Sequence, residues 1–254
     1  MSTAQQTVPA PAAAPPPAGP GVVAWRVVGG IVAAVIVVFA VGGVVASFTE
    51  QRRTATKAYP SGLSRIVVET STGSVDLRAG AAGSVVTVEQ SARSSFGSSA
   101  KTQESVTAGV LRLSGDCTGF GICSVGYTVT VPPGTAVEVT TSTGSVEAWG
   151  LDGDLDVTTS TGSIELTGLR SSRVGVQAST GSVELVFAAA PQDVRAKTST
   201  GSVEVVVPPD GTAYAVLSST NVGSSDVTVP IDSSSPRRIE AQASTGSVEV
   251  RPAG

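Results

Sequence analysis

Acidic residues recur at one position of a sequence pattern that is repeated along the chain. They follow copies of the pentapeptide Ser-Thr-Gly-Ser-Val, once Ser-Thr-Gly-Ser-Ile, as Asp76, Glu147, Glu165, Glu184, Glu204, Asp226 and Glu249. All but Asp226, the counterpart in a degenerate copy, stand five residues after the first Ser of a copy. If the copies stack as strands, neighbouring carboxylates lie about 4.8 Å apart. Such an acidic column could bind divalent cations or a basic partner; the simpler interpretation is a solvated face that keeps the stack soluble.

Catalytic chemistry finds little support in this composition. The chain has no His, which removes the commonest general base and the commonest metal ligand. A Ser nucleophile would need another base, and the lysines form no local motif with Ser: they are Lys57, Lys101 and Lys197. We therefore expect the protein to have no catalytic residue and no cofactor, and not to be an enzyme. A polysaccharide-acting enzyme, using charged side chains on a strand face, is the minor alternative.

A nucleic-acid partner is not expected either. The formal net charge is −4, and no basic cluster with interleaved aromatic residues occurs. The glycine of the pentapeptide is not followed by Lys, so a phosphate-binding loop is not indicated.

The two cysteines, Cys117 and Cys123, sit in the short stretch "DCTGFGIC". In an exported domain we expect them to close a small loop through a disulfide. Two free thiols are the alternative if the domain faces the cytoplasm. Two sulfurs alone do not make a metal site.

The pentapeptide copies define a repeat. Copies start at Ser142, Ser160, Ser179 and Ser199, with spacings of 18, 19 and 20 residues. A degenerate copy follows at Ser219–Ser224, the last copy starts at Ser244, and the first, Ser71, stands 71 residues before Ser142, close to four periods. Such a period is typical of a solenoid, in which each unit buries its apolar face against its neighbours.

Apolar residues alternate with polar ones on both sides of each pentapeptide, but the phase slips by one residue at Thr-Gly. Val137 and Val139 precede one copy, and Val146 and Ala148 follow the same copy. A continuous strand cannot change phase without turning one side to solvent, so the Thr-Gly step must be a bend, bulge or tight turn. The sequence predicts an all-β, β-solenoid-like stack of two-strand rungs. The alternative is an antiparallel, hairpin-based β-sandwich with Thr-Gly as the hairpin loop.

Residues 84–131 carry alternating strands without the pentapeptide. This stretch either continues the same stack less regularly or caps it, since the ends of a solenoid must be covered.

The N-terminal quarter differs from the repeats. Residues 1–26 form a Pro/Ala-rich tail that we expect to be disordered. Residues 27–48 contain no charge over 22 residues, a length that spans about 30 Å as a helix, and predict a single transmembrane helix. A polar juxtamembrane linker at 49–64 and a β-repeat domain at 65–251 complete the predicted organisation.

The orientation of the predicted membrane helix rests on competing signals. Arg26 precedes it, whereas Arg52, Arg53 and Lys57 follow it, and a count of these charges places the C-terminal side in the cytoplasm. Long domains cross largely regardless of charge, however, and two cysteines with few lysines are typical of an exported domain. We therefore expect a cytoplasmic N-terminus and an extracellular β domain.

The run "VEVTTSTGSVEAWGLDGDLDVTTSTGSIELTGL", Val137 to Leu169, resembles the bacterial putative-adhesin family of β-strand-repeat proteins, a domain of unknown function related to the toast-rack domains. The resemblance covers about residues 65–251, including the block from Cys117 to Thr135. It implies a β-solenoid-like fold, a location in the cell envelope and no known catalytic residues. Toast-rack domains also occur in envelope-stress systems. A membrane helix followed by this domain looks like an actinobacterial arrangement.

These observations lead to two functional hypotheses. The first is a single-pass protein of the cell membrane that displays its β repeats outside the cell and binds or scaffolds, with an envelope glycan or protein as ligand. The second is an accessory protein for envelope-stress sensing or signalling, with the N-terminal tail as its cytoplasmic output.

Overall fold

The computed structural model describes residues 51–254, and every regular element in this range is a β-strand. The predicted tail (1–26) and the predicted transmembrane helix (27–48) lie outside the described residues. Within residues 51–254, no helix of a length and hydropathy suited to crossing a membrane is present.

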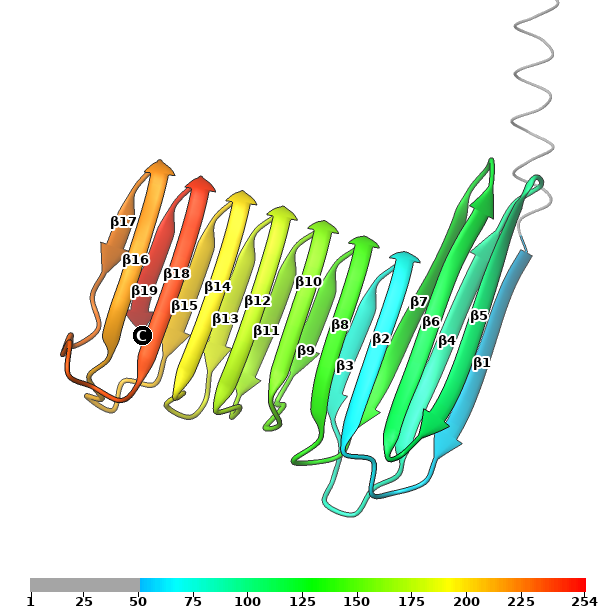
Figure 1. Cartoon of the computed structure of the whole chain (residues 1–254), viewed down its shortest axis with the longest axis horizontal. Coiled ribbons are helices and arrows are strands. Elements are labelled where there is room, and N and C mark those ends of the chain that lie inside the picture. Colours follow the sequence, from blue (N-terminus) through cyan, green and yellow to red (C-terminus); the bar gives the residue numbers. More distant parts are fainter. Residues whose placement is uncertain (1–50) are drawn as a thin grey trace, which may run out of the picture. The chain divides into compact units, whose positions relative to one another are not determined.

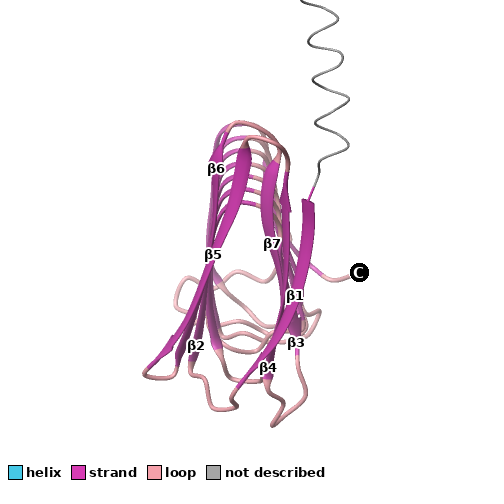
Figure 2. Cartoon of the chain, turned by 90° about the vertical axis from the view of Figure 1, so that its right-hand side faces the viewer, coloured by secondary structure: helices cyan, strands magenta, loops and turns pink. Residues whose placement is uncertain are grey.

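The strands form two long sheets that face each other (Figures 1 and 2). The ten-stranded sheet has the order β1 (Gln51–Tyr59), β4 (Val86–Ser94), β7 (Cys123–Val131), β3 (Val75–Ala79), β9 (Val146–Trp149), β11 (Ile164–Leu169), β13 (Val183–Phe187), β15 (Val203–Val207), β19 (Val248–Pro252) and β17 (Ser225–Val227). The nine-stranded sheet has the order β16 (Ala215–Val222), β18 (Arg238–Thr245), β14 (Asp193–Thr200), β12 (Arg173–Thr180), β10 (Leu155–Thr161), β8 (Ala136–Thr143), β2 (Arg65–Thr72), β6 (Val110–Gly119) and β5 (Ser98–Thr107).

Each pentapeptide copy is one rung that crosses from the nine-stranded to the ten-stranded sheet. The strand before a corner, such as β8, pairs in parallel with β2 and β10, and the strand after it, β9, pairs in parallel with β3 and β11. The two strands of one copy thus belong to different sheets throughout the described chain. The β-solenoid-like stack is confirmed, and the hairpin-based sandwich is wrong.

The corner of each rung depends on its glycine. Gly144 and Gly162 have φ of +149° and +144°, a region that residues with a side chain rarely adopt. A Cβ on Gly162 would also lie 2.0 Å from the carbonyl oxygen of Gly144 on the next rung. Meanwhile the Gly144 N–H donates to the Thr161 carbonyl at 2.9 Å, so the parallel ladder continues through the corner. The phase slip in the sequence is this turn from one sheet to the other.

The core lies between the sheets and is built from the predicted alternation. Val137 and Val139 before one corner, and Val146 and Ala148 after it, are all at most 3 % exposed. A buried Thr one residue before the first Ser adds a polar bond: the Thr198 hydroxyl donates to the carbonyl of Gly181 on the next rung at 2.9 Å. Hydroxyl bonds between rungs therefore run partly to glycine carbonyls, which the sequence did not indicate.

The order of rungs in space differs from their order in the sequence. The first copy, β2–β3, lies directly beside β8–β9, although 71 residues separate their serines. The last copy, β18–β19, is inserted between β14–β15 and the degenerate copy, β16–β17, which ends the stack. In the register of that end rung, Val222 pairs with Thr245 and Asp226 with Glu249. The degenerate copy thus aligns two residues later than the predicted Ser219.

At the other end, the segment without pentapeptides both continues and caps the stack. Strands β6 and β7 add one parallel rung, and β5, β4 and β1 then pair antiparallel. The predicted linker at 49–64 is wrong for residues 51–59, which form the edge strand β1. Across the open end, Glu104 of β5 accepts hydrogen bonds from Lys57 Nζ at 2.6 Å and Tyr59 Oη at 2.5 Å on β1. These bonds tie the two sheets together where the repeats stop.

The stacked glycine corners generate a first prediction. Gly162→Ala should lower the free energy of unfolding by about 2–4 kcal/mol, because it adds both a strained φ and a clash with a backbone carbonyl. Chemical denaturation followed by far-ultraviolet circular dichroism measures this change.

Gly175→Ala is the matched control, because its Cβ would meet nothing closer than Asp156 at 3.6 Å and its φ is not positive. It should change stability by no more than about 0.5 kcal/mol. Equal effects of the two substitutions would contradict the corner argument.

The Glu104 contact generates a second prediction. Burial alone would raise the pKa of Glu104, but the hydrogen bonds from Lys57 and Tyr59 outweigh it and lower that pKa below its ordinary value of 4.5. The stabilisation is therefore present above the unfolded pKa and is lost as pH falls through the folded one. Glu104→Gln should cost roughly 1–2 kcal/mol at pH 7. Denaturation of both proteins between about pH 7 and 3 should show this difference shrinking as the pH falls; a constant difference would contradict it.

Candidate functional site

The acidic residues singled out in the sequence form one row across the outer face of the ten-stranded sheet. Consecutive pairs along the row are matched in register on neighbouring strands, and the row runs Asp76, Glu147, Glu165, Glu184, Glu204, Glu249 and Asp226. We call this the acidic row. The neighbours of Glu147 on its own strand, Val146 and Ala148, are fully buried, so the carboxylate between them faces outward. The structure thus brings together every residue of the predicted column.

Parallel strands hold these carboxylates side by side without bringing them to one point. Within residues 51–254, no group of three or more Asp, Glu, Cys or His side chains is placed to hold a metal ion. Cation binding by the acidic row stays a prediction from the sequence. Neighbouring like charges cost stability, so this arrangement is one that packing alone would not favour.

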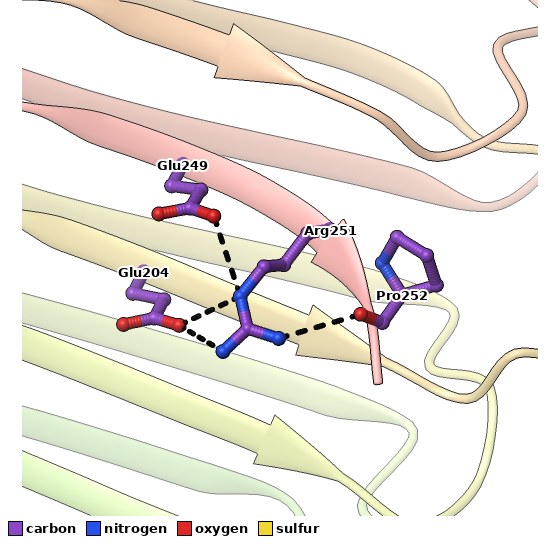
Figure 3. Close-up of polar contacts among 4 residues, drawn as sticks. All are labelled: Glu204, Glu249, Arg251 and Pro252. Carbon is purple, nitrogen blue, oxygen red and sulfur yellow. Dashed lines mark hydrogen bonds and ion pairs between the residues drawn. The ribbon is translucent and has the colours of Figure 1, made fainter. Parts of the chain in front are cut away.

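One arginine shows how a cation fits the acidic row (Figure 3). Arg251 of β19 contacts Glu204 of the neighbouring strand β15 through Nη2 and Nε, at 2.6 and 3.0 Å from Oε1. Its Nε also lies 3.3 Å from Oε1 of Glu249 on its own strand. Glu165 and Glu184, in the middle of the row, form no ion pair with a described residue. The row therefore offers carboxylates to a partner between its two ends.

An aromatic side chain adjoins the acidic row near its other end. Trp149 of β9 pairs in register with Arg78 of β3, and the guanidinium carbon of Arg78 lies 5.5 Å from the centre of the indole ring. Trp149 is 37 % exposed, and both residues lie two positions beyond an acid of the row. This corner of the sheet offers an aromatic face beside a cation and carboxylates.

A second polar surface lies on the outer face of the nine-stranded sheet. A shallow groove of about 300 Å³ is lined by side chains of both charges, among them Arg65, Glu138, Asp154, Asp156, Arg173 and Arg195. Arg65 pairs with Glu138 at 3.2 Å, and Arg173 pairs with Asp154. We call this the charged groove. Burial raises the pKa of Asp156, the nearby Glu138 raises it further, and Arg65 partly offsets both.

Sequence reasoning missed the charged groove, although a signal was present. The position four residues before the first Ser is charged in Glu138, Asp156 and Arg195, but in one copy it is Gly175. Gly175 pairs in register with Asp156 on one side and Arg195 on the other. Because Gly175 has no side chain, a gap remains between Asp156 and Arg195 on the outer face of the nine-stranded sheet, and this gap contributes to the charged groove.

The two cysteines lie at one end of the stack, where the structure joins Cys117 and Cys123 by a disulfide, with 5.7 Å between their Cα atoms. The bond links the ends of β6 and β7, which lie on different sheets. It closes the loop at 120–122 between them.

The acidic row generates a third prediction. Glu165→Gln combined with Glu184→Gln should raise the free energy of unfolding by about 0.5–1 kcal/mol at low salt, because it removes repulsion between neighbouring strands. The gain should shrink as salt screens the charges. Denaturation at two salt concentrations measures both effects.

Glu204→Gln is the control, since it removes the partner of Arg251 and should give no gain. If the double variant were less stable than the unchanged protein at low salt, the repulsion argument would be contradicted.

A family model described as Toastrack DUF4097 matches residues 54–251. Among curated proteins none matches the chain. A solved structure described as a "putative cell adhesion protein" from Clostridium sporogenes ATCC 15579 is 11% identical and has a TM-score of 0.46, with 80% of this chain and 100% of that chain covered. A "putative adhesin" from Bacteroides fragilis NCTC 9343 is 14% identical with a TM-score of 0.42, covering 79% and 97%.

Proposed function

This chain belongs to the Toastrack DUF4097 family, and from that premise we propose that it is a membrane-anchored, adhesin-like protein that binds or scaffolds at the cell envelope. The anchor is the segment 27–48, whose 22 uncharged residues suit a bilayer. The β domain faces the outside of the cell. A disulfide between Cys117 and Cys123 supports this placement, because such bonds persist in oxidising compartments.

The observation that carries the proposal is the repetition of like side chains at the spacing of neighbouring strands. The acidic row presents carboxylates on consecutive strands of one sheet, and the charged groove spans several strands of the other. A ligand with repeating polar groups, such as an envelope glycan, can meet several equivalent side chains at once. Many weak equivalent contacts give useful avidity without a deep pocket.

A binding role also agrees with the chemistry at hand. The sequence supplies no His, the commonest general base. The surfaces are polar and shallow, which suits reversible contact with hydrated polymers. Trp149 adds an aromatic face of the kind on which sugar rings stack.

A fourth prediction tests this proposal on the full chain in detergent micelles. The unchanged protein should be retained on insoluble cell-wall particles from its own source. Glu147→Gln, Glu165→Gln and Glu184→Gln combined, or Asp156→Asn with Arg195→Gln, should weaken retention by about ten-fold, the loss expected from roughly 1.4 kcal/mol of contacts. Co-sedimentation at a series of particle concentrations measures the affinity.

The matched control replaces charges outside the acidic row and outside the lining of the charged groove, Glu69→Gln with Arg112→Gln, which form an exposed pair on β2 and β6. It should leave retention unchanged. If retention were unchanged in all these variants, the assignment of the binding faces would be overturned. Release of soluble sugars would indicate an enzyme in place of a binding protein.

A further inference from the structure

Three large apolar side chains are exposed together at one end of the stack. Phe96, Phe120 and Ile122 are 79 %, 85 % and 66 % exposed. They lie on the loops at 95–97 and 120–122, which connect β4 to β5 and β6 to β7. These strands extend past the neighbouring rung: pairing of β2 with β6 ends at Gly115, whereas β6 continues to Gly119 (Figure 1). We call the three side chains the apolar tip.

The loops that carry the apolar tip are held firmly to each other. The Ser95 N–H donates to the Ile122 carbonyl at 2.9 Å, and the Ile122 N–H donates to the Ser95 hydroxyl at 2.9 Å. The Phe120 N–H donates to the Gly97 carbonyl at 3.0 Å. The disulfide between Cys117 and Cys123 joins the two strands that the loop at 120–122 connects. The backbone therefore presents the apolar side chains outward in a fixed arrangement, an exposure that marks an interaction site.

The described chain begins beside the apolar tip. Gln51, the first residue of β1, pairs with Ser94, which in turn pairs with Cys123. Phe48 ends the predicted membrane segment, and three residues later the chain is at Gln51. Three residues span at most about 11 Å. If 27–48 crosses a bilayer, the start of β1 and the tip beside it lie within reach of that bilayer's surface.

Charge at this end agrees with a lipid surface. Arg52 and Arg53 follow Gln51 on β1, and Arg52 pairs in register with Arg93 on β4. All three side chains are exposed. Basic residues near a membrane are attracted to anionic headgroups, and aromatic side chains favour the interface between headgroups and acyl chains. The end of the stack where the chain arrives combines both.

We propose that the apolar tip inserts into the membrane that holds segment 27–48, with Arg52, Arg53 and Arg93 against anionic headgroups. This inference rests on the proposed anchoring. The tip is a second membrane contact, carried by loops that begin 47 residues after Phe48 in the sequence. Two membrane contacts fix the orientation of the stack relative to the membrane, whereas a single anchor would leave the stack free to rotate.

The experiment uses the full chain in vesicles of phosphatidylcholine and phosphatidylglycerol that contain a photoreactive lipid. After irradiation, mass spectrometry maps the labelled peptides. We expect label on peptides covering 27–48 and on both tip loops. Phe96→Ser, Phe120→Ser and Ile122→Ser combined should reduce tip label at least about ten-fold and leave the label on 27–48 unchanged.

The chain offers a matched control at the opposite end of the stack. Leu217, Val222 and Ile231 are 55 %, 64 % and 63 % exposed, comparable to the tip. Their peptides should take up little label, and changing all three to Ser should leave tip label unaltered. Phe120→Trp guards against misfolding of the Ser variant: it should keep the label and shift its fluorescence to shorter wavelength in vesicles.

The outcomes separate the two proposals. Label on 27–48 without label on the tip overturns the apolar-tip proposal and leaves the anchor standing. Absence of label on 27–48 overturns the anchor. Equal label on the tip and on the peptides at 217–231 shows general apolar exposure and also overturns the tip proposal.

Discussion

The glycine corner is the constraint on which the rest of the structure depends. From the rung of Gly144 onward, the carbonyl of one corner glycine occupies the place where the next would carry a Cβ, with 2.0 Å between the Gly144 oxygen and a Cβ on Gly162. Only a residue without a side chain permits this approach, and the positive φ enforces the same choice. The corner fixes where the chain leaves one sheet for the other. The change of phase, the facing valines and the shared core follow from it.

Stacking the corners in register brings like charges together on the surface, which costs stability. When every rung turns at the same place, equivalent outward side chains must lie on neighbouring strands. The acidic row therefore places like charges next to one another, with Arg251 bridging Glu204 and Glu249 near one end. The same regularity turns one missing side chain, Gly175, into part of a groove. A repeat that is stable because it is regular thus also offers a repeating surface to a ligand.

The two ends of the stack must be covered, because an unpaired edge strand can pair with strands of another molecule. At the C-terminal end the degenerate copy forms the last rung, and β17 is only Ser225–Val227. At the other end antiparallel strands close the core, and Glu104 binds Lys57 and Tyr59 across the gap. Irregularity is concentrated where the repeat stops. Two loops at this end carry the exposed Phe96 and Phe120.

The sequence by itself determined the rung: its two strands, its glycine corner, its buried valines and the alignment of Glu147 with Glu165 and Glu184. These features depend on the φ angle of one glycine and on the alternation of apolar and polar residues over a few positions. Both can be recognised in a short stretch of sequence. Tertiary structure alone decided the rest. Strand β1 was missed because all but Tyr59 of its residues are exposed, so it carries no alternating apolar pattern and is held by backbone pairing. The order of rungs was also hidden, since closing a longer loop costs little more than closing a shorter one and leaves no mark on the residues within it. Which rung lies beside which, and therefore where the apolar tip and the start of β1 meet, is set by packing between segments far apart in the chain.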